Sequence, residues 1–586
     1  MRFEMDKNIW INGKGIPMDN NRNSHFVING DDSRSGFKNI KKLRVGIMLD
    51  NYRLEAWDYT MVEAITRSDY ASIELILFNE SRNEKKSLGD KILSNRTTLF
   101  YIAYRKLEDR ISQPNPACTP KDAKNLLKDV PVLGINPDKN SGRFQEQDIV
   151  RIKESNLDVI IRCGFRILSG DILKAAKYGV WSYNYADPSV IRGGPPGFWE
   201  FFERMGERGA ILQVLTDGLD NGIVLYRSSF PFDSLFVNKN NCDCFLRSSL
   251  FVPRTLRKLF YEGEKVFFDK IERDNKKLTV YNDALYTTPT NLKFFTMFIK
   301  HSYHIGTSLF HDKFFNEQWL LMYDLQDRIS TSFWGFKKII PPKDRFWADP
   351  HVFFKDDIYY IFIEEYIYKK KKAHISLIEM QQSGKYSDPV KVLEEPFHLS
   401  YPHVFNYNGI LYMIPETRRA KSINLYQCTG FPNEWKHRDT LIDSIEAVDS
   451  TILFHKNKWW LFTNVVEPEG TSQQNELYLF FSDNLLSHTW KSHPMNPVIS
   501  DLKRARPAGK ILEHNGILYR PSQCCNPWYG YGIKLNEIVA LTENDYSERE
   551  IAFIEPKWDK KLKGVHTLCH ENRLTMIDGY YDTFVV

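Results

Sequence analysis

The stretch Asp349-Pro-His-Val-Phe-Phe-Lys-Asp-Asp-Ile-Tyr-Tyr-Ile-Phe-Ile363 decides the fold of the C-terminal half, because four later segments repeat its pattern. Each segment has a polar or small opening, a short apolar strand, a turn rich in Asn, Asp, Gly or Lys, and a second strand. The later segments open at Tyr401, Asp449, Arg506 and Gly564, so that neighbouring openings are 48 to 58 residues apart. A propeller blade of four short strands needs roughly 40–50 residues. The repeat therefore predicts a five-bladed β-propeller over residues 317–586.

The openings of these repeats predict where a ligand would bind. In a propeller the innermost strands surround the central axis, so residues at their starts converge on one mouth. The polar residues expected there are Asp349, His403, Asp449, Arg506 and His566. They could simply cap strands and turns. The alternative is a polar pocket on the axis that binds a sugar or another polyol, with Trp347 and Tyr401 stacking at its rim.

Trp347-Ala-Asp-Pro350, followed by an aromatic strand, resembles the first blade of five-bladed carbohydrate-active propellers such as invertases and arabinanases. The last 270 or so residues look most similar to the N-terminal domain of plant glucosamine inositolphosphorylceramide transferases, which is not the transferase module itself. The glycosidase resemblance implies a base or nucleophile at Asp349, a pKa-tuning aspartate at Asp449, and an acid at Glu416. Two such carboxyl groups would have to flank the scissile bond.

The N-terminal half has a different pattern. Residues 1–38 are polar and predict a loose tail. Strand-like and helix-like segments then alternate from 39 to 230, for example Leu43–Leu49, Trp57–Thr66 and Ile73–Phe78. This alternation predicts a doubly wound α/β domain. The first strand is not followed by Gly-x-Gly-x-x-Gly, which argues against an ordinary dinucleotide site.

Two segments of this half, 181–200 and 216–225, resemble the formyltransferase family of methionyl-tRNA, glycinamide-ribotide and sugar-nucleotide formyltransferases. The run Arg192-Gly-Gly-Pro-Pro-Gly-Phe-Trp199 matches the middle of the family pattern, and Arg192 and Trp199 are candidate substrate contacts. Gly218-Leu-Asp-Asn-Gly222 matches the family's turn. The resemblance implies that Asn184 helps to hold an oxyanion and that Asp220 is the catalytic aspartate.

The family also uses a histidine, but this chain has none between residues 27 and 300. Asp187 and Tyr185 are the candidates for its position, and their ordinary pKa values lie far from neutrality. Three alternatives stay open. Asp187 and Asp220 could form a carboxylate pair with one raised pKa; the domain could bind a ligand without transferring a group; or it could carry out different acyl or sugar chemistry. Formyltetrahydrofolate is a doubtful cofactor without the imidazole.

Composition adds a few expectations. The net charge of +5 over 586 residues and the short run Lys369–Lys372 give no reason to expect a nucleic-acid partner. We expect no transmembrane segment, no metal, and eight reduced cysteines in a cytoplasmic protein. Residues 231–316 should form a helical linker, interrupted at Pro253. Its helices could pack against the domains, form a dimer surface or touch a membrane.

These features together predict a protein that modifies or assembles a cell-surface glycan. The leading hypothesis is a transferase that uses an amino-sugar or a nucleotide-linked sugar. One alternative is a non-catalytic sugar-binding protein with a degenerate formyltransferase domain. The other is a glycosidase acting from the propeller, which would need Glu416 beside Asp349. The sugar, the acceptor and the oligomeric state are not specified by the sequence.

Overall fold

The structure is a computed structural model that describes residues 41–81, 96–112, 118–138, 141–217, 222–232, 236–276, 285–330, 332–467 and 471–585. The predicted tail, residues 1–38, lies outside these ranges. The chain divides into two compact units. One reaches to His301 and includes Glu467–Ser472, and the other contains Ser302–Val466 and Gln473–Val586.

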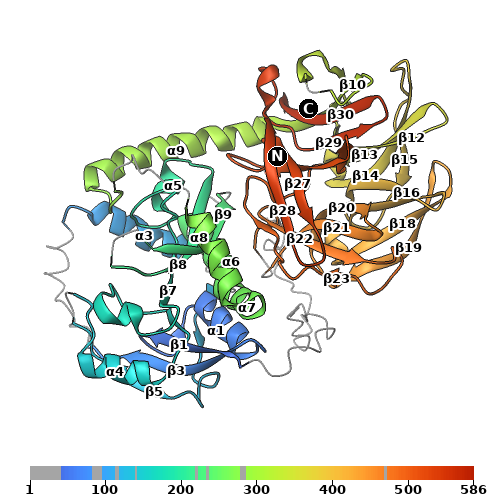
Figure 1. The fold of residues 1–586 in the computed structure, drawn as a ribbon. Coiled ribbons are helices and arrows are strands. Elements are labelled where there is room, and N and C mark those ends of the chain that lie inside the picture. The colour runs from blue at the N-terminus through green and yellow to red at the C-terminus, as the bar shows by residue number, and fades with distance from the viewer. Residues whose placement is uncertain are drawn as a thin grey trace. The chain divides into compact units, whose positions relative to one another are not determined.

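The first unit is built on a seven-stranded sheet with the order β5-β3-β1-β6-β7-β8-β9 (Figure 1). The strands are β1 Leu43–Leu49, β3 Ala71–Asn79, β5 Val132–Ile135, β6 Val159–Arg162, β7 Val180–Asn184, β8 Glu207–Val214 and β9 Ile223–Pro231. The first five strands in this order run parallel, whereas β8 and β9 are antiparallel. A short separate sheet pairs β2 Arg53–Leu54 with β4 Lys121–Asp122.

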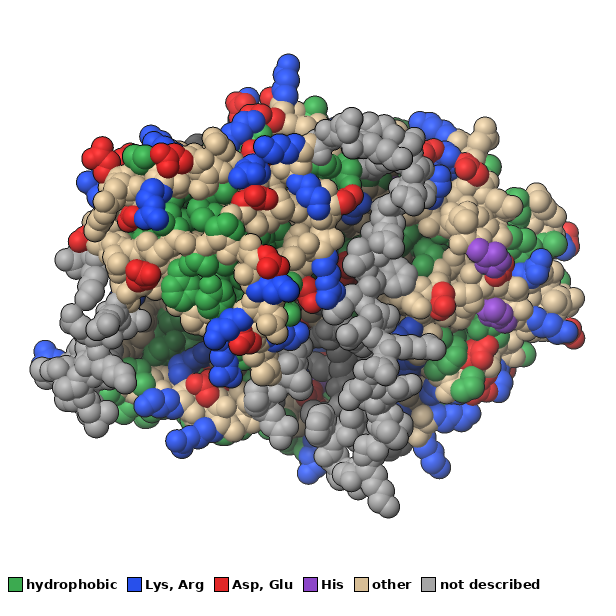
Figure 2. Space-filling model, turned by 90° about the horizontal axis from the view of Figure 1, so that it is seen from below, with side chains coloured by type: hydrophobic (Ala, Val, Ile, Leu, Met, Phe, Trp, Pro, Cys, Tyr) green, Lys and Arg blue, Asp and Glu red, His purple; other side chains and the backbone are tan. Residues whose placement is uncertain are grey.

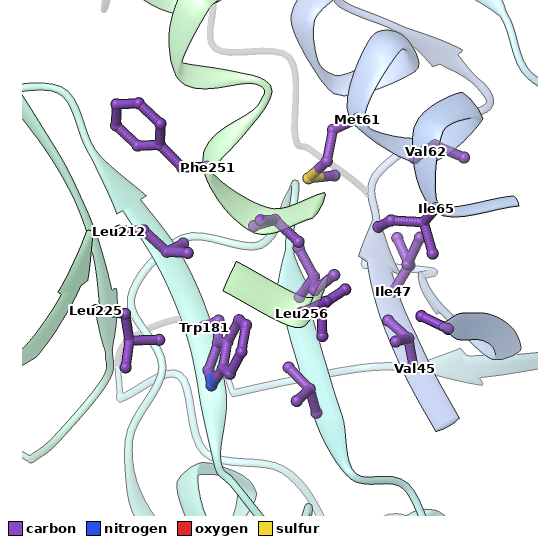
Figure 3. Packing of buried hydrophobic residues seen from close by; sticks show 14 of the residues in the cluster. Val45, Ile47, Met61, Val62, Ile65, Trp181, Leu212, Leu225, Phe251 and Leu256 are labelled. Carbon is purple, nitrogen blue, oxygen red and sulfur yellow. The ribbon is translucent and has the colours of Figure 1, made fainter. Parts of the chain in front are cut away.

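Successive residues of a strand point to opposite faces of the sheet, and the strands are apolar on both faces. Helices therefore cover each face. Val45 and Ile47 of β1 pack in one core with residues of α1 (Ala56–Thr66), as Figure 3 shows. Met48 belongs to the core on the other face, together with Ile149 and Ile152 of α4 (Glu146–Glu154). The predicted α/β class is therefore confirmed, with an antiparallel edge added to the parallel sheet.

Residues 231–316 contain the expected helices, but not as a separate linker. They are α6 Val237–Ser248, α7 Phe251–Glu262, α8 Glu264–Asn275 and α9 Asn291–Phe314. Phe251 and Leu256 of α7 and Phe267 of α8 belong to the core that contains β1. The α/β unit thus continues past residue 230. Pro253 does not interrupt a helix, since it lies in the first turn of α7, where its missing N–H needs no partner.

The remaining helices are α3 Leu99–Ile111 and α5 Phe198–Phe202, with the 3₁₀ turn η3 Gly170–Lys174. None of the helices in the described ranges is long and apolar enough to cross a membrane. On the face seen in Figure 2, basic and acidic side chains are interspersed.

The second unit is a five-bladed β-propeller (Figure 1). The four blades that are continuous in the chain consist of β12–β15, β16–β19, β20–β24 and β25–β28. Their strands are β12 Arg345–Lys355, β13 Ile358–Ile367, β14 Lys372–Gln381, β15 Val390–Leu393, β16 Ser400–Tyr407, β17 Ile410–Glu416, β18 Ser422–Gly430, β19 Glu434–Asp443, β20 Ala447–His455, β21 Lys458–Val465, β22 Glu476–Ser482, β23 Lys491–Ser492, β24 Ile499–Ser500, β25 Leu512–His514, β26 Ile517–Cys524, β27 Gly532–Leu541 and β28 Tyr546–Ile554.

The fifth blade closes the propeller with strands from both ends of the unit. Its order is β11-β10-β30-β29, with the bounds Lys337–Ile339, Phe315–Leu325, Leu574–Phe584 and Leu568–Glu571. β10 pairs with β30 over its full length, from Phe315 opposite Phe584 to Leu325 opposite Leu574. Pairing of strands from the two ends of the unit within one blade closes the ring of blades.

One expectation about the cysteines is wrong. Cys118 and Cys242 form a disulfide between the segment after α3 and helix α6, whereas all eight cysteines had been expected to be reduced. Their side chains meet because both pack beside Ala56 at the start of α1. The spacing of 124 residues gives no indication of this pairing in the sequence.

Candidate functional site

The innermost strands of three blades share a β-bulge that shapes the mouth of the propeller. The pairing register shifts between Ala348 and His351 in β12, and equivalent shifts occur in β16 and β20. The residues inside the bulges, Asp349, Tyr401 and Asp449, have φ values of 52°, 44° and 52°. Non-glycine residues rarely adopt this left-handed conformation, which clusters at functional sites. Bulges also re-aim side chains.

Asp349 takes part in a buried network with His566 and Asp578. Its Oδ1 accepts a hydrogen bond from Thr567 Oγ1 at 2.7 Å and lies 3.6 Å from His566 Nε2. The other imidazole nitrogen, Nδ1, is 2.7 Å from Asp578 Oδ2. Although burial lowers the pKa of His566, Asp578 and Asp349 raise it to about 9. The imidazole is therefore a cation held between two carboxyl groups.

A second buried ion pair lies in the same mouth. Arg506 Nε donates to Asp449 Oδ2 at 2.5 Å, and Gln523 Nε2 donates to the same oxygen at 2.9 Å. Arg506 Nη2 is also 3.9 Å from Glu416 Oε2. Two polar atoms of this group, Arg506 Nη1 and Gln523 Oε1, have no hydrogen-bond partner among the described residues. Buried polar atoms normally have partners, so these two atoms are exceptions to the usual pattern.

Two glutamates of the mouth have raised pKa values. Burial, followed by the nearby Asp449, raises the pKa of Glu416 to about 8, although Arg506 opposes the shift. Burial and then Asp349 raise the pKa of Glu364 well above its ordinary value. Glu416 therefore holds a proton at neutral pH and can donate it, and the same direction of shift favours the protonated form of Glu364. Glu416 is partly exposed, at 14% of its side-chain area, and can be reached from solvent.

The network unites Asp349, Asp449, Arg506 and His566 but not His403. The electric field of Asp349 and of His566 acts on Asp449. His403 lies two residues beyond the bulge, at the position of His351, and the two rings are 5.4 Å apart. Neither aromatic residue predicted to stack on a sugar at the rim is accessible for it. Tyr401 is fully buried, with its hydroxyl 2.7 Å from Thr451 Oγ1, and Trp347 is only 7% exposed.

Sequence reasoning missed Glu364 and Asp578. Glu364 is followed by Glu365 in the otherwise apolar strand β13, and alternate residues of a strand point to opposite faces. At least one glutamate of such a pair must therefore face the interior. The pair thus indicates a buried carboxyl group in this strand. Asp578 gives a weaker signal, because β30 contains a second aspartate, Asp582, and the strand pattern does not single out either one.

The Asp349, His566 and Asp578 group also has the dimensions of a metal site. Each residue offers one ligand atom, and these atoms lie within 4.8 Å of one another. However, a ligating imidazole must be neutral, and the pKa of His566 is raised to about 9. Asp578 also accepts hydrogen bonds from the backbone N–H groups of Asp349, His566 and Thr567. This arrangement fits an ion-pair network better than a metal centre.

In the α/β unit the predicted catalytic residues have structural partners. Asn184 ends β7, and its Oδ1 accepts a hydrogen bond from the N–H of Ala186 at 3.0 Å. Asp187 is 2% exposed; its Oδ1 binds the backbone N–H and the hydroxyl of Ser189, and its Oδ2 is 2.9 Å from Arg227 Nε. Asp220 lies outside the described residues, so the structure does not test the predicted triad.

The Arg192–Trp199 run joins another part of the same unit. Gly193 forms a β-bridge with Tyr286, and the N–H of Gly194 donates to the carbonyl of Tyr286 at 3.0 Å. Trp199 is 2% exposed, and its indole N–H donates to the carbonyls of Gly194 and Thr287. Trp199 is therefore a packing residue in this structure, and a ligand could not stack on it. Arg192 stays partly exposed.

Asp58 is an ionisable group of this unit that the sequence analysis did not select. It lies in the first turn of α1. Burial, followed by Glu55, raises the pKa of its carboxyl group to about 7. After burial, the charge of Asp58 is the next largest contribution to the raised pKa values of Cys163 and Tyr185, which follow β6 and β7. Acidic residues are common in the first turn of a helix, where they interact favourably with the helix dipole. The sequence therefore does not indicate that Asp58 is buried with a raised pKa.

Comparison with known proteins supports both predicted resemblances. Residues 339–574 match the family model described as "Glucosamine inositolphosphorylceramide transferase 1, N-terminal". The propeller thus resembles that domain, as predicted. The glucosamine inositolphosphorylceramide transferase 1 of Arabidopsis thaliana is 33% identical over 211 residues, which are 36% of this chain and 27% of the relative. This chain therefore spans about a quarter of the length of that relative.

A methionyl-tRNA formyltransferase of Prochlorococcus marinus is 35% identical over 83 residues, which are 14% of this chain and 24% of the relative. This finding confirms the resemblance to formyltransferases. Among solved structures, a family 117 glycoside hydrolase of Zobellia galactanivorans matches 45% of this chain and 90% of its own chain, with 10% identity and a TM-score of 0.30.

Proposed function

We propose that this protein belongs to the machinery that modifies or assembles a glycan, and that the propeller mouth binds an amino-sugar unit of its substrate. The observation that carries the proposal is the buried charge cluster with unsatisfied polar atoms at Arg506 and Gln523. Sugar hydroxyls both donate and accept hydrogen bonds, so they could pair with such atoms. The match to a domain of a glucosamine transferase supports the same substrate class.

The charge of the mouth favours an ammonium group on the sugar. Three aspartates face one arginine and one imidazolium, and two glutamates whose protonated forms are favoured lie beside them. The acidic residues are Asp349, Asp449, Asp578, Glu364 and Glu416. An amino-sugar cation would be attracted by the aspartate charge in excess, and it would favour the ionised form of Glu416. A nucleotide-linked sugar with a free amino group would present the same chemistry.

Isothermal titration of the full chain with glucosamine, N-acetylglucosamine and glucose tests this proposal. We expect glucosamine to bind most tightly, because N-acetylation removes the charge. Glu416→Gln keeps the side-chain shape and should weaken glucosamine binding, whereas Glu513→Gln, at an exposed position of β25, serves as the matched control. Equal affinity for the three sugars, or no effect of Glu416→Gln, would contradict the proposal.

A second candidate function is glycoside hydrolysis from the propeller. The specific observation in its favour is Glu416, whose pKa near 8 suits a general acid at neutral pH. Asp349 would then be the base or nucleophile. The test is the release of nitrophenol from nitrophenyl glycosides, compared between the unmodified chain and Asp349→Asn. Sugar binding without release of nitrophenol would contradict hydrolysis and support the binding role.

A further inference from the structure

Two adjoining hollows lie on the propeller away from the charge cluster of the mouth. Their volumes are about 290 Å³ and 370 Å³, and Asp559 and Lys560 line both of them. The walls come from the 3₁₀ turns η4 (Phe333–Gly335) and η7 (Pro556–Trp558), from β11, and from the segment between β26 and β27. Together the hollows have the size of a small-ligand site.

Aromatic rings form the walls of these hollows. Phe333 and Trp558 stack with ring centres 5.0 Å apart in one hollow, where Trp334 is 83% exposed. Trp528, which is 46% exposed, lies in the other hollow with Tyr531, 5.2 Å between ring centres. Large aromatic side chains that stay in contact with water commonly mark binding surfaces. Flat rings of this kind can stack against the face of a sugar.

The rim of the hollows is basic. Lys338, Lys557, Lys560, Lys561 and Lys563 line them. The acidic neighbours are already paired: Asp559 binds Lys338, and the hydrogen bond from this lysine lowers the pKa of the Asp559 carboxyl. Glu555 binds Lys557 in the same way. The ammonium groups of Lys560 and Lys561 have no ion-pair partner in the described parts of the chain, so they remain available to an anion.

One loop separates the hollows from the mouth. Tyr529 faces the mouth, where the guanidinium of Arg506 lies 4.9 Å from its ring centre and His566 lies 5.8 Å away. Its neighbour Trp528 lines the outer hollow, and the indole N–H donates to the carbonyl of Lys563 at 3.2 Å. The two surfaces therefore adjoin, but they differ in charge: the mouth is rich in carboxyl groups and the hollows are rich in ammonium groups.

We propose that these hollows form a second carbohydrate site that binds an anionic sugar, one carrying a phosphate or a carboxylate. The tryptophan rings would stack on the sugar, and Lys560 and Lys561 would pair with the acidic group. This site does not depend on the proposed role of the mouth, because no residue of the mouth cluster lines it.

Isothermal titration of the full chain with glucose 6-phosphate, glucuronic acid, glucose and inorganic phosphate tests this proposal. We expect at least one of the two anionic sugars to bind, and the phosphate and carboxylate arms tell which acidic group is preferred. Binding should weaken as salt is added, since the lysines are exposed. Glucose and inorganic phosphate should each bind at least about tenfold more weakly, because each offers only half of the recognised chemistry.

Variants separate the two contributions. The double variant Lys560→Ala/Lys561→Ala and the single variant Trp334→Ala should each lower the affinity about tenfold. The matched control, Lys436→Ala/Lys456→Ala, removes two exposed lysines elsewhere on the propeller and should bind normally. All four positions are exposed, so folding should be unaffected. Tight binding of inorganic phosphate alone, equal losses in the control, or no loss in the lysine variant would each overturn the proposal.

Discussion

The propeller and the α/β unit use buried acidic residues in different ways. In the propeller, Asp449 pairs with Arg506, which is itself buried, and polar atoms beside this pair stay unsatisfied. In the α/β unit, Asp187 pairs with Arg227, whose side chain is 48% exposed, and its remaining oxygen binds the next turn of the loop. The comparison teaches that burial of a carboxylate does not by itself identify a site. What distinguishes the propeller mouth is that several charged groups share one buried network, in which Asp449 pairs with Arg506 and His566 lies between Asp349 and Asp578.

The largest expected effect comes from removing the aspartate of the propeller pair. Asp449→Ala should lower the free energy of unfolding by about 3–5 kcal/mol, because it leaves the buried Arg506 charge without its main partner. Urea unfolding followed by circular dichroism measures the change, and hydrogen exchange shows whether propeller peptides carry it. A loss below about 1 kcal/mol would mean that water or Glu416 compensates Arg506, and the contrast between the two units would disappear.

The corresponding change in the α/β unit should cost less. Asp187→Ala removes an ion pair and the hydrogen bonds to Ser189, for which we expect a loss of about 1–3 kcal/mol. Water can solvate the half-exposed Arg227 after the change, which limits the penalty. The same unfolding assay applies, and Asp187→Asn serves as the control because it can still accept the Ser189 hydrogen bonds. A loss as large as that of Asp449→Ala would show that the two pairs are equivalent.

The pH dependence of the propeller sharpens the comparison further. The raised pKa of Glu416, about 8, means that the folded protein holds a proton that the unfolded chain releases above about 4.5. The free energy of unfolding should therefore fall as pH rises from about 4.5 to 8. The stability contributed by His566 is complete below about pH 6.5 and is lost as pH rises through 9, in the same direction.

Hydrogen exchange measured at several pH values between 5 and 9 would follow this loss in propeller peptides. Glu416→Gln should flatten the dependence below about pH 6.5 and leave the loss that His566 contributes between about pH 6.5 and 9. Glu513→Gln should change neither. A propeller that becomes more stable between pH 6.5 and 9 would contradict the assigned directions for both groups.

The smallest expected effect concerns Asp58 in the α/β unit. Its pKa of about 7 implies that the stability of this unit falls as pH rises from about 3.8 to 7, since the folded state keeps the proton longer. Asp58→Asn should remove this dependence from hydrogen exchange of α1 and β6 peptides while leaving propeller peptides unchanged. Unaltered pH dependence of α1 in this variant would show that another group titrates there.

The sequence was sufficient where information is local. The five-fold repeat predicted the propeller and four residues that meet in its mouth, Asp349, Asp449, Arg506 and His566, because each blade carries its own strand and turn pattern. Strand and helix alternation predicted the α/β sheet for the same reason. Glu416 was also selected from its place at the end of a strand, and the structure puts its carboxyl group within 3.9 Å of Arg506.

Tertiary structure decided what depends on distant parts of the chain. Asp578 and Asp349 are 229 residues apart in the sequence. They meet because β30 pairs with β10 and so lies next to the first blade. The N–H of Tyr401 donates to Asp349 Oδ2 at 3.1 Å, a contact between neighbouring blades that the strand pattern of either blade does not specify. Local periodicity specifies a strand, but it does not specify register between strands or which charges share one buried volume. Those features arise from long-range pairing and close packing, which place residues without any fixed spacing in the sequence.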